Sequence, residues 1–299
     1  MKTFPEWERE VLDLTYDSVD YISMHKYWSN SEHRSDEREI GKNNTTNYLT
    51  NSIGLQTYIS NVESTINFIK SKKRSAKNIK ISFDEYQPWY HSIKKMNTHL
   101  NSNIKDWPKA YPILEDEYNL LDCLLVGTVI NTFINNSHIV KIACMAQLVN
   151  VIPAISTAKN GISWRQSVYY PLYFASLYGR GESLQLKINS PKYSSDIADD
   201  VNYIDASAVI NEEEKTLSFF IINRSEEERV DLDFDINNLP IIKIIDQQII
   251  NHTNIYASNT ISKPNEIVPK ITNIASFQNE KLMAKIPKLS YLFILLKIK

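Results

Sequence analysis

Residues 1–178 alternate between helical and strand-like patterns, but they hold only three apolar strand segments, which limits what they can fold into. The predicted strands are Val19–Met24, Ile79–Phe83 and Lys141–Leu148. The helical segments between and around them are Pro5–Asp17, Asn47–Lys70, Tyr118–Asn135 and Trp164–Tyr178. This alternation is typical of parallel βα units. A (β/α)₈ barrel needs eight strands and about 250 residues, so this part is predicted to be the last portion of a TIM barrel.

From about residue 179 the helical pattern stops, and short runs of Ile, Val, Leu and Phe alternate with polar turns. The predicted strands are Ser183–Ile188, Ile204–Ile210, Thr216–Asn223, Glu228–Phe234, Ile241–Asp246, Glu280–Ile286 and Ser290–Leu296. Short strands at regular spacing are typical of an antiparallel β-sandwich. The predicted fold is therefore α/β plus all-β, with a partial barrel over residues 1–178 and a sandwich over residues 179–299.

Several local expectations follow from the same patterns. In the first helix Trp7, Val11, Leu12 and Leu14 fall on one side and are expected to be buried. Pro171 is expected to mark a kink or a break in the last helix of the barrel part. In a partial barrel the strand edges stay unpaired, so the apolar strand residues should pack on one side only. Those residues are Ile22, Ile79, Ile81 and Ile142.

Composition excludes several function classes. The chain has 299 residues, 42% hydrophobic and 23% charged, which is ordinary for a globular protein. Its formal net charge of −2 provides no basic field for nucleic acid or an anionic membrane. Cys123 and Cys144 each lie in an apolar run and are predicted to be buried, reduced thiols, which fits a cytoplasmic setting. The sequence shows no metal-ligand spacing, and no cofactor is expected.

Candidate catalytic groups gather at the ends of the predicted strands. Glu85 follows Ile79–Phe83, at the position where barrel enzymes place catalysis. Its neighbour Asp84 should point to the opposite side, because successive strand residues alternate. The other strands end near His25 or Tyr27 and at Gln147. Each of these residues alone has an ordinary structural explanation, such as a solvated turn or a strand cap. Their shared position predicts a site at one edge of the sheet.

Longer motifs carry a resemblance to a known family. They are Phe4–Leu12, Val19–His25, Ser82–Glu85 with Trp89–His91, Glu117–Leu120 with Asp122, Lys141–Ile152, Trp164–Gln166 and Tyr178–Gly181. With these segments the chain resembles glycoside hydrolase family 51, the α-L-arabinofuranosidases, from residue 3 to about residue 193. Beyond that point the resemblance rests on the sandwich architecture. Where the family usually has Trp and Asn after the Asp-Glu pair, this chain has Tyr86 and Gln87, which puts the local packing in doubt.

The resemblance implies a role for each matching position. Glu85 matches the nucleophile, and Tyr27 matches the tyrosine that hydrogen-bonds it. Gln147 matches a glutamine that contacts the sugar, and His25 and Trp89 match positions that line the site. The family also needs a general acid/base glutamate in an Asn-Glu pair after an earlier strand. The Asn-Glu pairs of this chain, which include Asn211-Glu212 and Asn265-Glu266, lie in the sandwich part. The acid/base is therefore expected to precede residue 1.

The expected function is that of a retaining, non-reducing-end α-L-arabinofuranosidase that releases L-arabinose from arabinan or arabinoxylan oligosaccharides. The chain by itself is expected to be inactive and to need a separately encoded N-terminal half as its partner. Members of the family often form hexamers, so the resemblance also allows a homo-oligomer. Neither nucleic acid nor a membrane is expected as a partner. Two alternatives stay open: an inactive carbohydrate-binding or degenerate remnant, and an endo-acting glucanase.

Overall fold

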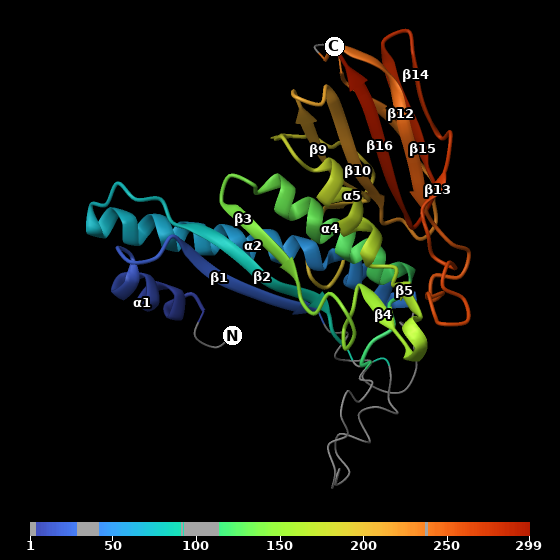
Figure 1. The fold of residues 1–299 in the computed structure, drawn as a ribbon. Helices are drawn as coiled ribbons and strands as arrows, with labels where there is room; N and C mark the ends of the chain where they lie inside the picture. Colours follow the sequence, from blue (N-terminus) through green and yellow to red (C-terminus); the bar gives the residue numbers. More distant parts are fainter. Residues whose placement is uncertain (1–3, 29–41, 91, 93–113, 237–238) are drawn as a thin grey trace, which may run out of the picture.

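The computed structural model describes residues 4–28, 42–90, 92, 114–236 and 239–299, with only the backbone described for residues 42–44. His91, which belongs to one of the family-like motifs, lies outside the described residues. Figure 1 shows helices packed with a small group of strands in the N-terminal half of the chain, and a larger group of strands formed by the C-terminal half.

The N-terminal half is built on a parallel sheet. Its strands are β1 (Tyr21–Trp28), β2 (Lys80–Pro88) and β3 (Val140–Met145), in the order β1-β2-β3. Helices α1 (Glu6–Thr15), α2 (Lys42–Lys73) and α4 (Leu120–Asn135) accompany it. One face packs against these helices, and the rings of Phe83 and Phe133 lie 4.9 Å apart there. Because β2 lies in the middle, both β1 and β3 are edge strands within the described residues.

The opposite face of this sheet is open. Four consecutive residues of β3, Lys141 to Cys144, are exposed, and so is Tyr21 of β1. The expectation of one-sided packing is confirmed for Ile142, which is 39% exposed. It is wrong for Ile22, Ile79 and Ile81, because their side chains point to the helices and are buried.

Two sequence predictions fail for related reasons. Cys123 is buried in α4 as predicted, but Cys144 is exposed because it lies on the edge strand β3. In helix α1 Leu12 is buried, whereas Trp7 and Leu14 are exposed. An apolar pattern shows which residues would be stable away from water, but in the described part of the chain these positions remain exposed.

The C-terminal half consists of antiparallel strands. A six-stranded sheet has the order β13-β12-β16-β10-β9-β6, and a three-stranded sheet has the order β11-β15-β14. The first sheet comprises β6 (Glu182–Leu184), β9 (Ile204–Asn211), β10 (Thr216–Asn223), β12 (Ile241–Ile250), β13 (Lys270–Ile271) and β16 (Ser290–Ile298). The second comprises β11 (Val230–Phe234), β14 (Ala275–Gln278) and β15 (Lys281–Ile286). Apolar side chains of both sheets form one core, which includes Phe219, Leu282 and Leu292.

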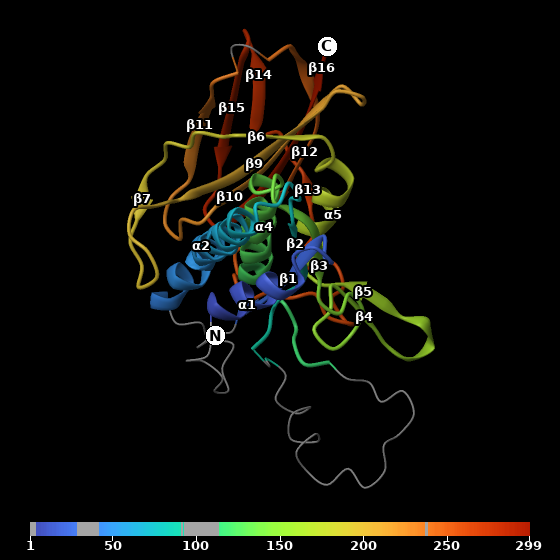
Figure 2. The same cartoon turned by 90° about the vertical axis from the view of Figure 1, so that its left-hand side faces the viewer.

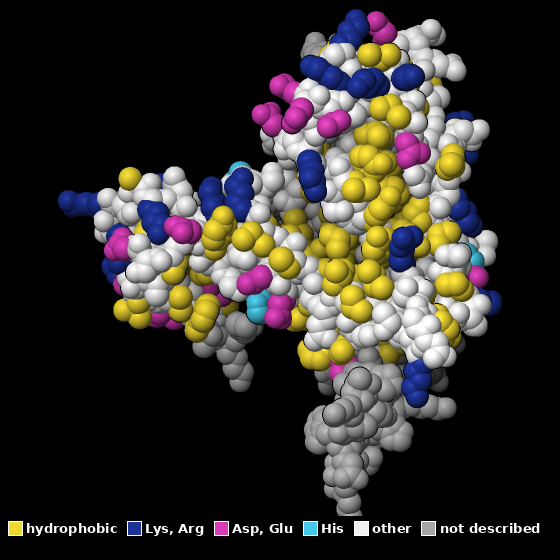
Figure 3. All heavy atoms as spheres, in the orientation of Figure 1, with side chains coloured by type: hydrophobic (Ala, Val, Ile, Leu, Met, Phe, Trp, Pro, Cys, Tyr) yellow, Lys and Arg dark blue, Asp and Glu magenta, His cyan; other side chains and the backbone are white. Residues whose placement is uncertain are grey.

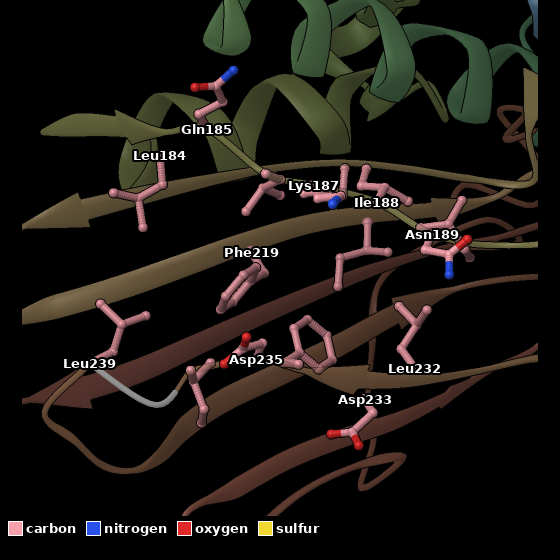
Figure 4. A pocket seen from close by; sticks show the side chains of 16 residues that line it. Leu184, Gln185, Lys187, Ile188, Asn189, Phe219, Leu232, Asp233, Asp235 and Leu239 are labelled. Carbon is pink, nitrogen blue, oxygen red and sulfur yellow. The ribbon is translucent and has the colours of Figure 1, made fainter.

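Each strand predicted for this half overlaps an observed strand. The short strands β13, β14, β7 (Lys192–Tyr193) and β8 (Val201–Asn202) were not predicted. A cavity of about 330 Å³ opens beside β11, between the two sheets (Figure 4). Its lining is mostly apolar, with Leu184, Phe219, Leu232 and Leu239 around it, and it contains none of the predicted site residues.

Helix α4 connects the two halves. Most of its residues are buried, and it contacts α2 and α5 (Tyr169–Tyr178) as well as β9 and β10 (Figure 2). From α4, Asn131 donates a 2.7 Å hydrogen bond to Asp205 of β9. The buried Arg224 donates to the same carboxylate at 2.5 Å and to Ser52 of α2 at 3.0 Å. A buried charge pair with these additional partners ties the α2–α4 pair to the strands of the second half.

The last helix of the N-terminal half begins later than predicted. Residues Ser163–Arg165 form strand β5, which pairs with β4 (Ile155–Thr157) around the short 3₁₀ helix Lys159–Gly161. Helix α5 then starts at Tyr169, so Pro171 lies in its first turn. The predicted kink or break is wrong, because proline is tolerated in the first turn, where its missing N–H would have no helical partner.

Candidate active site

Both acidic residues at the end of β2 lie on the open side of the sheet. The strand continues past Glu85 to Pro88, and its register with β3 shifts between Phe83 and Tyr86. Phe83 and Tyr86 are buried, and the two residues between them, Asp84 and Glu85, are partly exposed. The expectation that only one of them faces the centre is therefore wrong. A bulge-like irregularity interrupts the strict alternation of side chains.

Glu85 accepts a short hydrogen bond from β1. The Tyr27 hydroxyl donates to Glu85 Oε2 at 2.6 Å, and His25 Nδ1 lies 3.5 Å from the same oxygen. Desolvation raises the pKa of Tyr27 well above its usual value, and its hydrogen bond to Glu85 raises it further. The phenol therefore stays protonated at neutral pH and acts as a fixed donor to the carboxylate.

A second set of contacts lies beside the first. Ser23 donates a 2.7 Å hydrogen bond to Asp84 Oδ1, and the Ser23 oxygen lies 3.3 Å from His25 Nε2. The same His25 nitrogen lies 3.2 Å from Asp84 Oδ1. Figure 3 shows a histidine flanked by acidic side chains on this side of the molecule. Sequence reasoning missed Ser23 and Asp84, although the i, i+2 spacing of Ser23 and His25 on one strand gave a signal for the first.

Trp89 and Gln147 border this group in different ways. The Trp89 ring lies edge-on to Tyr27, with centroids 5.4 Å apart, and its indole N–H donates to Glu115 at 2.8 Å. Gln147 is exposed in the loop after β3, next to Ala146, whose N–H donates to the carbonyl of Tyr86. The structure thus brings His25, Tyr27 and Trp89 together around Glu85 and places Gln147 on the neighbouring loop.

Gln147 has an unusual backbone conformation. Its φ is 55°, and Asn150 and Val151 follow with φ of 60° and 67°. Positive φ is uncommon for residues other than glycine and a genuine outlier for a β-branched valine. Such strain persists only where the surroundings hold it, and it often accompanies functional loops. Asn150 is held by Thr157, whose N–H donates to its side-chain oxygen at 2.8 Å.

Asp122 is a buried carboxylate near the site. From the sequence it was named only as part of a family-like motif. Asp122 accepts hydrogen bonds from the hydroxyls of Tyr48 at 2.6 Å and Tyr90 at 2.8 Å, and from the N–H of Asn119 at 2.8 Å. Burial raises its pKa to about 6, and these hydrogen bonds oppose the rise. The network holds Tyr90, and with it the neighbouring Trp89, against the start of α4.

The two departures from the family pattern are accommodated in the core. Tyr86 packs its buried ring edge-on against Phe133, with centroids 5.0 Å apart. Gln87 is also buried and donates a 3.3 Å hydrogen bond to the carbonyl of Ile152. Neither side chain displaces Glu85 from Tyr27. Within the described part of the chain, no group of three or more His, Cys, Asp or Glu side chains is placed to hold a metal ion.

Comparison with known proteins identifies the family. The family described as "Alpha-L-arabinofuranosidase C-terminal domain" matches residues 84–290, and the chain belongs to it. The chain is 40% identical, over 99% of its length, to the intracellular exo-alpha-(1->5)-L-arabinofuranosidase 1 of Bacillus subtilis (strain 168). It is 38% identical, over 97% of its length, to the intracellular exo-alpha-(1->5)-L-arabinofuranosidase of Halalkalibacterium halodurans.

Solved structures give the same result. AbfB, a family 51 alpha-L-arabinofuranosidase from Bifidobacterium longum, superposes with a TM-score of 0.88 and 27% identity over 99% of this chain. An arabinose complex of the Thermotoga maritima enzyme superposes with a TM-score of 0.73 and 22% identity, and shares the fold. The chain spans 56% of the B. subtilis relative and 56% of the AbfB chain, about half of each. None of the described helices is both long and apolar enough to cross a bilayer.

Proposed function

We propose that this chain is the C-terminal part of a retaining α-L-arabinofuranosidase and that Glu85 is its nucleophile. The observation that carries the proposal is the 2.6 Å hydrogen bond from Tyr27 to Glu85 at the carboxyl end of two parallel strands. Barrel enzymes place their catalytic groups at this end. We assign residues 1–178 to the last strands and helices of a (β/α)₈ barrel, and residues 179–299 to a β-sandwich.

In this mechanism Glu85 attacks the anomeric carbon of the arabinofuranosyl unit and forms a covalent glycosyl ester. A second carboxyl group protonates the leaving oxygen, then removes a proton from the water that hydrolyses the ester, so the configuration is retained. Tyr27 would hold Glu85 in position through its hydrogen bond. Gln147 would bind sugar hydroxyls, and the aromatic face of Trp89 and the imidazole of His25 would border the sugar.

The second carboxyl group would come from a polypeptide outside these 299 residues. Retaining enzymes place the two carboxyl groups about 5–5.5 Å apart. Asp84 is close to Glu85, but its Oδ1 is already engaged by Ser23 and His25. The exposed face of the parallel sheet and its two edge strands fit a missing N-terminal half that would complete the barrel. Without that half, the chain is expected to be inactive.

The names of the relatives support a substrate class and a location. Several are named intracellular exo-acting arabinofuranosidases, which supports arabinose-containing oligosaccharides as the substrate class and a cytoplasmic location. Arabinan and arabinoxylan fragments are the proposed sources of the released L-arabinose. A homo-oligomer is compatible with the family resemblance.

The test uses a completed enzyme, in which this chain is joined to the N-terminal part of the B. subtilis relative that it does not match. An aryl α-L-arabinofuranoside is the substrate. We expect activity from the completed enzyme, none from the isolated chain, and a loss of at least about 10³-fold in Glu85→Gln. Glu213→Gln, in the exposed turn between β9 and β10, is the control.

Two outcomes would contradict the proposal. An inactive completed enzyme would favour the carbohydrate-binding or degenerate remnant. Hydrolysis of glucose-based but not arabinose-based substrates would favour the endo-acting glucanase.

A further inference from the structure

The imidazole of His25 bridges two carboxylates and presents a different nitrogen to each. Its Nδ1 lies 3.5 Å from Glu85 Oε2, and its Nε2 lies 3.2 Å from Asp84 Oδ1. Ser23 binds on the Asp84 side, donating to Asp84 Oδ1 at 2.7 Å with its oxygen 3.3 Å from Nε2. Neither Asp84 nor Ser23 has a role in the mechanism above.

The chemistry of these groups decides which nitrogen carries the hydrogen. An ionised carboxylate only accepts hydrogen bonds, so Asp84 and Glu85 compete for the one hydrogen of a neutral imidazole. The Asp84 side has the shorter contact, 3.2 Å against 3.5 Å, and Ser23 provides a second acceptor there. The Ser23 hydroxyl uses its hydrogen on Asp84, and its lone pairs can accept from His25 Nε2. In neutral imidazole one nitrogen donates and the other accepts. The hydrogen of the neutral ring is therefore assigned to Nε2, and Nδ1 is the nitrogen that faces Glu85.

We propose that Asp84 is a positioning residue, which together with Ser23 fixes His25 in its Nε2–H form and keeps Nδ1 directed at the nucleophile. The tautomer of a histidine is commonly set by the partner of its other nitrogen. When Nδ1 is protonated, Glu85 Oε2 receives a hydrogen bond in addition to that of Tyr27. This inference rests on the proposed role of Glu85 as nucleophile. The bulge-like shift that turns Asp84 and Glu85 to the same side makes the arrangement possible.

Nitrogen NMR of the isolated chain, labelled with ¹⁵N-histidine, tests the tautomer directly. At about pH 9 an ordinary imidazole is neutral, and the two ring nitrogens report which one carries the hydrogen. The His25→Gln variant assigns the signals of His25. We expect the Nε2–H form to dominate in the wild type and its ratio to the Nδ1–H form to fall about fivefold in Asp84→Ala. Ser23→Ala should lower the ratio less, because Asp84 remains.

His138 provides the internal control. It lies beside Glu63 on a different part of the surface, with Nε2 3.2 Å from the carboxylate, so its signals should not change in any of these variants. Unchanged His138 signals also show that a variant has folded. An equal tautomer ratio in the wild type and Asp84→Ala, with His138 unaffected, would overturn the inference.

Kinetics of the completed enzyme separate this inference from the proposed function. Asp84→Ala should lower kcat about tenfold and change KM less than about twofold, and Asp84→Asn, which keeps an acceptor, should restore part of the loss. If the completed enzyme is active and its kcat is unchanged by Asp84→Ala, this inference is overturned and the proposed function is not affected. Inactivity with the native Asp84 would overturn the proposed function and the catalytic part of this inference, whatever the tautomer result.

Discussion

At the residue scale, the hydroxyl group of Tyr27 can be tested by a substitution that removes only this group. It donates to Glu85 Oε2 at 2.6 Å. Hydrogen bonds to charged groups are worth about 1.5–3 kcal/mol, so Tyr27→Phe should lower kcat of the completed enzyme by about 10- to 100-fold. Tyr21→Phe, an exposed tyrosine at the start of the same strand, is the matched control and should stay within about twofold. Equal rates for both variants would mean that Tyr27 does not assist the nucleophile.

Also at this scale, the sequence predicted which residues belong to the site better than it predicted which side of the sheet their side chains face. His25, Tyr27 and Glu85 were predicted from their place at strand ends, and the structure brings them together. Asp84 was expected to point to the side of the sheet opposite to Glu85, because strict alternation of side chains cannot predict the register shift between Phe83 and Tyr86. The rings of Phe83 and Tyr86, on either side of this shift, both pack against Phe133 of α4. Such tertiary packing is not encoded in the local sequence pattern. The role of Ser23 depends on the same shift.

At the scale of elements, Asp122 links α2, α4 and the end of β2, and it makes stability depend on pH. Burial raises its pKa to about 6, against 3.8 as its ordinary value. Between pH 4 and 6 the folded chain therefore holds a proton that the unfolded chain has lost. Its contribution to stability is fully present below about pH 4 and is lost as the pH rises through 6.

Urea unfolding of the wild type and Asp122→Asn at pH 5 and pH 7 measures this contribution. The difference in unfolding free energy, wild type minus variant, should be larger at pH 5 than at pH 7 by on the order of 1 kcal/mol. Asp199→Asn, at an exposed aspartate, should show no such change. A difference that grows towards pH 7 would mean that Asp122 is ionised more easily in the folded state than when exposed.

The helices and strands also show which elements a local sequence pattern can predict and which it cannot. Each strand predicted for the C-terminal half overlaps an observed one, because alternating apolar residues and polar turns are local signals. The bounds were less accurate: β6 ends at Leu184 and not at Ile188, and β12 continues to Ile250 and does not end at Asp246. The start of α5 was placed too early, since Ser163–Arg165 pairs with Ile155–Thr157, a contact that no local pattern encodes. The two-residue strands were missed because two residues give no period to detect.

At the scale of the whole molecule, the open face of the parallel sheet is the surface where we expect a partner to bind. Ile142 is exposed on this face, Trp7 and Leu14 are exposed on the nearby helix α1, and among the described strands β1 and β3 are edge strands with backbone groups free to pair. Cys144, predicted to be buried, is exposed on the same edge strand as Ile142, because an apolar run does not reveal that its strand lies at the edge of a sheet. A polypeptide that completes the sheet should stabilise the chain by binding only its folded form.

Mixing the isolated chain with the separately produced N-terminal half of the B. subtilis relative tests that expectation. At about 100 times the dissociation constant, binding contributes about 2.7 kcal/mol, which should raise the midpoint of thermal unfolding by roughly 5–10 °C. Ile142→Lys places a charge on the open face and should weaken the complex, whereas Ile242→Lys, at an exposed isoleucine of β12, should leave it intact. Size-exclusion chromatography measures the complex independently of heating. If the two halves elute separately and the midpoint does not move, the exposed face is not completed by such a half, and a remnant becomes the better description of this chain.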